Sequence, residues 1–162
     1  MILGQFVLMI ALGIYGFWGT FHPSAFSILD GANILFHEAG HLVFGILGNY
    51  IGIWGGTLMQ LLMPAGIGLG FLAKKEPFSS AVMFFWLGEN LIPMAHYIRD
   101  SRAQVLPFIG GEIHDWNYIL SSAHLLEYDQ GLGNFVQGLG FLVMMAAVFM
   151  GARDCWLRFR KT

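Results

Sequence analysis

The sequence contains the motif His-Glu-Ala-Gly-His at residues 37–41, inside an apolar segment. On a helix, His37 and His41 lie one turn apart on the same face, so their imidazoles can reach a single metal ion. Glu38 follows the first histidine and can reach a metal-bound water as general base. Zinc is the usual occupant of this motif and activates water for attack on a carbonyl. The motif therefore predicts a zinc-dependent hydrolytic site.

A catalytic zinc usually has three protein ligands and one open position, so this motif needs a further ligand from elsewhere in the chain. The candidates are carboxylates and imidazoles near the later apolar segments, namely Glu89, His96, Asp100, His114 and Asp115. Asp115 stands where an apolar helical run begins, a position at which Asp is also favoured as an N-cap. Adjacent residues at a helix start point in different directions, so His114 and Asp115 are not expected to bind one ion together, and the sequence alone leaves all of these candidates open.

The composition is that of a membrane protein. Of 162 residues, 56% are hydrophobic and 11% are charged, against about 25% charged in a soluble domain. An ionisable side chain without a partner or a function is costly inside a membrane helix, so the membrane setting strengthens a functional interpretation of the histidine motif. The formal net charge of −2 suggests no nucleic-acid partner. The length predicts a single domain over residues 1–162.

Apolar stretches account for most of the chain, and each of the five longest approaches the ~20 residues that a helix needs to cross the hydrocarbon core. They are Met1–Thr20, Phe26–Leu47, Ile51–Ala73, Phe78–Ile98 and Gly131–Met150. The shorter segment Trp116–Leu126 predicts a partial or re-entrant helix. The expected fold is an all-α integral membrane bundle of about five transmembrane helices plus this partial helix.

Basic residues form two clusters, Lys74–Lys75 and a C-terminal group from Arg153 to Lys161. The positive-inside rule places both clusters in the cytoplasm. With five crossings, the N-terminus is then expected outside and the C-terminus inside. We expect an integral protein of a bacterial-type inner (cytoplasmic) membrane, in contact with the lipid bilayer.

The apolar helix with its HEAGH motif resembles the site-2 protease family of intramembrane metalloproteases. In that family a later membrane segment carries an Asn-Pro motif, followed by an Asp that opens a helix and ligates zinc. Here Asn90-Leu91-Ile92-Pro93 is similar to the first part, and His114-Asp115-Trp116 opens a helical run as the family's Asp does. The Asp-Gly-Gly form is absent, and the interval between the two parts is longer than in the family. The match covers the HEAGH helix and, in part, residues 89–120.

The resemblance implies that Asp115, ahead of His114, is the third zinc ligand. It implies a zinc metalloendopeptidase that hydrolyses peptide bonds of membrane-embedded or membrane-proximal polypeptides, with Glu38 as general base. By the same resemblance, the glycine-rich segment Asn49–Gln60 could form a short extended element that binds the substrate backbone. A plain turn between helices is the other interpretation of that segment.

Three polar residues in the apolar stretches are candidates for supporting roles. Glu89, Asn90 and Gln60 could orient the zinc histidines or contact the substrate. Simple hydrogen bonds between helices are the alternative. Glycine pairs four residues apart, at Gly52/Gly56 and at Gly66/Gly70, predict close contacts between helices.

A second function class also fits these residues. Intramembrane His, Asp and Glu mark ion and proton pathways, so a membrane transporter or metal-handling protein is the main alternative. A non-catalytic scaffold with a structural metal is a third. The oligomeric state does not follow from the sequence.

Overall fold

The computed structural model describes residues 2–22, 29–106 and 113–161, and these form helices and their connections. Six α-helices follow one another, with a short 3-10 turn at Leu126–Tyr128 before the last: α1 (Ile2–Phe21), α2 (Asp30–Gly45), α3 (Asn49–Ala73), α4 (Pro77–Arg99), α5 (Asp115–Ser122) and α6 (Asp129–Phe159). The described residues contain no strand. The prediction of an all-α protein is confirmed.

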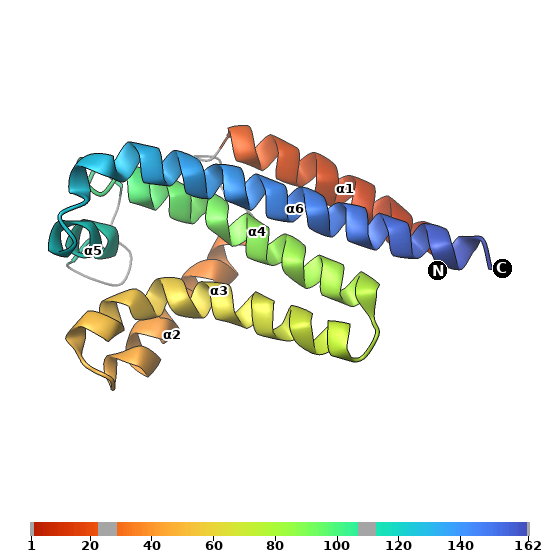
Figure 1. The fold of residues 1–162 in the computed structure, drawn as a ribbon, viewed down its shortest axis with the longest axis horizontal. Coiled ribbons are helices and arrows are strands. Elements are labelled where there is room, and N and C mark those ends of the chain that lie inside the picture. The colour runs from red at the N-terminus through yellow and green to blue at the C-terminus, as the bar shows by residue number, and fades with distance from the viewer. Residues whose placement is uncertain (1, 23–28, 107–112, 162) are drawn as a thin grey trace.

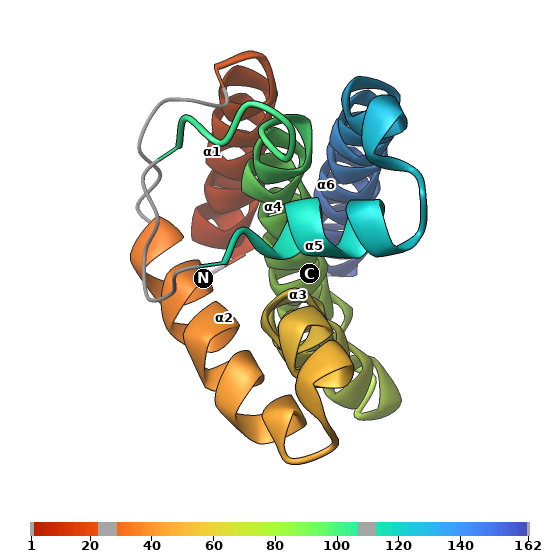
Figure 2. The ribbon, with the colours of Figure 1, turned by 90° about the vertical axis from the view of Figure 1, so that its left-hand side faces the viewer.

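The long helices lie along one axis of the molecule (Figure 1). Helix α4 packs along α6, α1 covers α6, and α3 flanks α4. Helix α2 packs on α3, to which it is joined by a tight connection. Viewed end-on, the short helix α5 lies across the ends of α4 and α6 (Figure 2). The two chain ends and the α3–α4 connection lie together at the opposite end of the molecule (Figure 1).

Three helices, α1, α3 and α6, are long and apolar enough to cross a membrane. Their outer faces carry large exposed apolar side chains, such as Leu3, Ile14, Phe135 and Phe149, as expected when the surrounding solvent is lipid. Helix α2 has 16 residues and is therefore about 24 Å long, shorter than the ~30 Å hydrocarbon core. Of the apolar stretch expected at Phe26–Leu47, residues 26–28 lie outside the described residues.

The most buried helix is α4, which contributes both apolar core residues and buried polar residues. Phe85 and Ile92 of α4 pack against Met144 and Ala147 of α6. The two backbones approach closely at Gly88, where an added Cβ would lie 2.8 Å from the carbonyl oxygen of Gly140. Small residues permit this approach, and close packing holds helices together in lipid.

The expectation of an extended element at Asn49–Gln60 is wrong, because these residues form the first half of α3. A helix satisfies its own backbone hydrogen bonds, which an isolated strand in lipid cannot do. The glycines of this segment serve contacts with α2, since a Cβ on Gly52 would lie 2.9 Å from Cα of Gly45. The predicted Gly66/Gly70 contact is not formed, because added Cβ atoms there would meet nothing within 4 Å.

Candidate metal centre

Helices α2 and α5 bring three potential metal ligands together. The Nε2 atoms of His37 and His41 lie 2.9 and 3.2 Å from the same carboxylate oxygen, Oδ2 of Asp115. One ligand atom from each of the three residues lies within 4.8 Å of the others. His37 and His41 come from adjacent turns of α2, and Asp115 is the first residue of α5. The structure thus brings the preferred third-ligand candidate to both motif histidines.

The second ring nitrogen of His41 identifies its tautomer. Its Nδ1 lies 2.8 Å from the carbonyl oxygen of Gly52 on α3. A carbonyl oxygen can only accept a hydrogen bond, so Nδ1 of His41 carries the proton. In the neutral ring, Nε2 then holds an unshared electron pair that faces Asp115.

A chain of side-chain amides fixes the tautomer of His37 in the same way. The amide nitrogen of Asn90 donates to the carbonyl of Trp86 (3.1 Å), so the side-chain oxygen of Asn90 is left to accept. The amide nitrogen of Gln60 donates to that oxygen (3.1 Å). Oε1 of Gln60 then accepts from Nδ1 of His37, at 2.9 Å. The predicted supporting residues Gln60 and Asn90 therefore act as a relay that directs the Nε2 electron pair of His37 toward Asp115.

The result is three electron-rich atoms facing one another. Two imidazole electron pairs and one carboxylate oxygen cannot be held at these distances without a cation between them, either a proton or a metal ion. Two imidazoles and a carboxylate form a common donor set for catalytic zinc. Ligand atoms on a tetrahedral zinc with ~2.0–2.1 Å bonds lie about 3.3 Å apart, close to the two separations of 2.9 and 3.2 Å between the imidazole Nε2 atoms and Oδ2 of Asp115. The donor set fits zinc.

Space for the two imidazoles is provided by Gly56 on α3. A Cβ at this position would lie 2.6 Å from Nε2 of His37 and 2.7 Å from Nε2 of His41. Any side chain would therefore displace the groups that form the cluster. The sequence marked Gly56 only as a helix-packing glycine, and its role beside the histidines requires the register of α2 against α3.

The N-terminus of α5 holds Asp115 in place. The backbone N–H of Asp115 donates to the hydroxyl of Tyr97 on α4, at 3.2 Å. His114 caps the helix, because its Nδ1 accepts from the backbone N–H of Asn117 (3.2 Å). The rings of Tyr97 and His114 stack with centroids 4.1 Å apart. Tyr97 was not foreseen from the sequence, where nothing distinguished it from an interfacial tyrosine.

The other candidate ligands lie outside the cluster. Nε2 of His114 lies 3.4 Å from Oδ2 of Asp100, and Asp100 also accepts from the backbone N–H groups of Val105 and Leu106 at 3.0 and 3.1 Å. Burial lowers the pKa of His114, and the facing Asp100 carboxylate opposes this effect. The pair ties the segment after α4 to the start of α5. His96 is likewise not part of the cluster.

Glu89 also lies outside the cluster and links helices instead. It is buried on α4, where its Oε2 accepts from the side-chain amide of Asn33 at 2.9 Å. The oxygen of Asn33 accepts from Nε1 of Trp86 at 2.8 Å. Asn33 lies one turn before His37 on α2, so these bonds fix the rotation of α2 about its axis. Glu38 follows His37 and is half-buried.

Comparison with known protein families, curated proteins and solved structures finds no significant match to this chain.

Proposed function

We propose that this protein is a membrane-embedded zinc metalloendopeptidase that hydrolyses peptide bonds of membrane-embedded or membrane-proximal polypeptides. The observation that carries the proposal is the approach of the Nε2 atoms of His37 and His41 to one oxygen of Asp115, while acceptors on α3 hold both Nδ1 atoms. A donor set of this kind, with a glutamate directly after the first histidine, is that of a hydrolytic zinc site.

In this proposal His37, His41 and Asp115 hold the zinc ion. Zinc, when bound, would supply Lewis acidity, which lowers the pKa of water toward ~7 and polarises the substrate carbonyl. The carboxylate of Glu38 accepts the proton that the attacking water loses and returns it to the nitrogen of the leaving amine. Gln60 and the Gly52 carbonyl keep both imidazoles in the tautomer that binds metal.

Metal analysis and a cleavage assay on the purified full chain test the proposal. The wild type is expected to hold a stoichiometric zinc ion and to cleave a single-span polypeptide in proteoliposomes. His37→Ala and Asp115→Ala should lose the metal, while Glu38→Gln should keep it and lose cleavage. Full zinc retention in His37→Ala, or undiminished cleavage by Glu38→Gln, contradicts the proposal.

A membrane transporter is the second candidate, favoured by the buried carboxylate of Glu89 within the bundle. Intramembrane carboxylates mark ion pathways and proton relays, and the Tyr15 hydroxyl donates to Glu89 at 3.4 Å. A transporter predicts that Glu89→Gln abolishes ion movement into proteoliposomes. The peptidase predicts that the same variant retains cleavage.

A further inference from the structure

The basic residues are gathered at one end of the molecule. Six of the eight Lys and Arg residues lie there: Lys74 and Lys75 directly after α3, and Arg153, Arg158, Arg160 and Lys161 in the last turns of α6 and after it. Both groups lie with the chain termini at the end of the bundle away from α5 (Figure 1). We call this the basic end. Within 15–20 residues of membrane helices, such a bias marks the cytoplasmic side.

The two remaining arginines, at the end where α5 lies, are held by protein groups. Arg102 forms an ion pair with Asp129, at 2.6 Å. Arg99 donates to the side-chain oxygen of Gln137 at 2.7 Å, and its carbonyl accepts from Gln130. Arg102 is nevertheless exposed, and Arg158 of the basic end is likewise paired, with Asp154 at 2.7 Å. The orientation therefore rests on the numbers, with six cations at the basic end and two at the other end.

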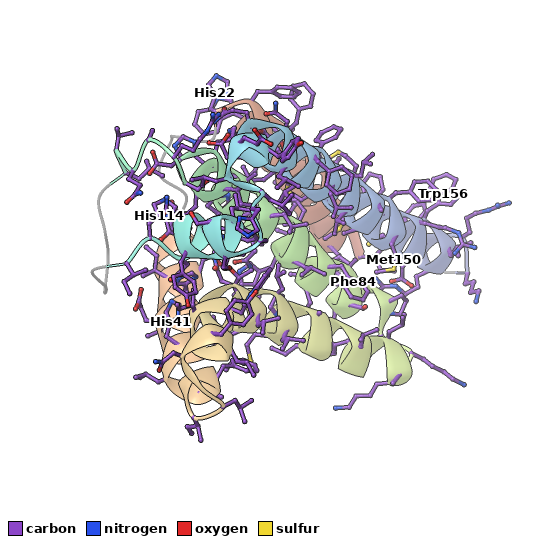
Figure 3. The ribbon with its side chains drawn as sticks, turned by 60° about the vertical axis from the view of Figure 1, so that its left-hand side comes forward. His22, His41, Phe84, His114, Met150 and Trp156 are labelled. Carbon is purple, nitrogen blue, oxygen red and sulfur yellow. The ribbon has the colours of Figure 1, made fainter. Side chains whose placement is uncertain are left out.

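The candidate metal centre lies far from the basic end. Gly56, which touches both motif histidines, precedes Lys74 by 18 residues of continuous helix, or about 27 Å at 1.5 Å per residue. The hydrocarbon core is ~30 Å thick. His41 and His114 lie at the end opposite Trp156 of α6 (Figure 3). With Lys74 at one membrane boundary, the metal centre is therefore close to the other.

We infer that the metal centre opens to the side of the membrane opposite the cytoplasm, and that its substrates are polypeptide segments at that outer boundary. The substrate half of this inference rests on the proposed function. In this arrangement the chain crosses the membrane four times, through the three long apolar helices α1, α3 and α6 and through α4, which packs between α3 and α6. Helix α2 returns without crossing. The termini share the cytoplasmic side, which replaces the sequence-based expectation of an external N-terminus.

This placement removes two difficulties of hydrolysis in a membrane. Water reaches the site from the outer aqueous phase and need not cross the bilayer. A substrate helix also requires little unwinding, because the backbone groups of its last turn have no intrahelical partners. The class of substrate is therefore a membrane-anchored polypeptide cut where its span meets the outer surface.

Cysteine labelling tests the orientation independently of any activity. Cys155 is buried and is the single cysteine, so Cys155→Ser gives an unreactive parent. Into it we would introduce Val105→Cys, at an 80% exposed position on the side of the metal centre, or Glu76→Cys, at an exposed position of the basic end that leaves every cation intact. A membrane-impermeant maleimide should label the first in intact cells and the second only after permeabilisation. Labelling of Glu76→Cys in intact cells, or protection of Val105→Cys in them, overturns the inference.

Two matched substrates test the cleavage side. One cleavable sequence is placed at the outer end or at the cytoplasmic end of the same single-span polypeptide, and both are co-reconstituted with zinc-loaded protein. Only the outer placement should be cut. Cutting at the cytoplasmic end alone overturns the inference and leaves the peptidase proposal standing. Cutting of neither contradicts the proposed function, and the labelling result still decides the orientation.

Discussion

Oε1 of Gln60 lies 2.9 Å from Nδ1 of His37, so a residue of α3 determines which nitrogen of a residue of α2 faces Asp115. The direction of this hydrogen bond is set by the carbonyl of Trp86. Because Asn90 donates its amide to that carbonyl, the Asn90 oxygen must accept from Gln60, and the Gln60 oxygen must then accept from His37. A metal-binding histidine commonly needs such an acceptor on its second nitrogen. Here the acceptor belongs to an amide relay that joins three helices.

Removing the acceptor should weaken zinc binding. Gln60→Leu leaves Nδ1 of His37 without its partner, and loss of such a partner typically lowers metal affinity 10–100-fold. Gln60→Glu keeps an oxygen at that position and should lose less. Competition with a chelator of known zinc affinity measures both. Equal affinity in wild type and Gln60→Leu would show that the relay does not matter for metal binding.

Much of the helical framework could be predicted from the sequence, since apolar stretches of ~20 residues are a strong signal for helices in lipid. The expected segment Phe78–Ile98 corresponds to α4 at Pro77–Arg99, and Trp116–Leu126 overlaps α5. The extended element at Asn49–Gln60 was implied by the family resemblance and not by the residues, and its glycines, which weaken a helix in water, did not oppose it. Against a neighbouring helix in lipid, glycine permits close packing.

The candidate site was predictable only in part. The spacing of His37 and His41 fixes a shared helical face, but no spacing links them to Asp115, which lies 74 residues after His41 in the chain. That link depends on how α5 lies across the ends of the other helices. The partners of the two Nδ1 atoms, Gln60 and the Gly52 carbonyl, depend on the register between α2 and α3. The glycine-rich sequence of these helices does not predict that register.

A methyl group at Gly56 should disrupt the cluster. Its Cβ would lie 2.6 Å from His37 and 2.7 Å from His41, so Gly56→Ala must move one or both imidazoles, and zinc content should fall sharply. Gly66→Ala is the matched control, because its Cβ meets nothing within 4 Å in the same helix. It should retain full zinc, measured by elemental analysis of the purified variants. Comparable zinc in both variants would contradict the described packing around the histidines.

Loss of the Glu89 carboxylate should destabilise the fold. Glu89→Leu leaves the buried Asn33 amide without its acceptor, at a cost of about 1–2 kcal/mol for an interhelical hydrogen bond in lipid. Glu89→Gln keeps an acceptor oxygen and should cost less. Thermal unfolding in detergent measures the difference as a lower Tm for the leucine variant. An unchanged Tm in Glu89→Leu would indicate that this bond does not hold α2 to α4.

His114 should affect the site through its cap on α5 and not as a ligand. His114→Asn retains a side-chain oxygen that can accept from the Asn117 N–H, because Asn is a strong N-cap residue. His114→Leu removes the cap, at a cost of about 1 kcal/mol, and loosens the start of the helix that presents Asp115. We expect zinc affinity close to wild type in His114→Asn and reduced in His114→Leu, as measured by chelator competition. An equal and complete loss of zinc in both variants would identify His114 as a ligand, since neither replacement supplies an imidazole nitrogen.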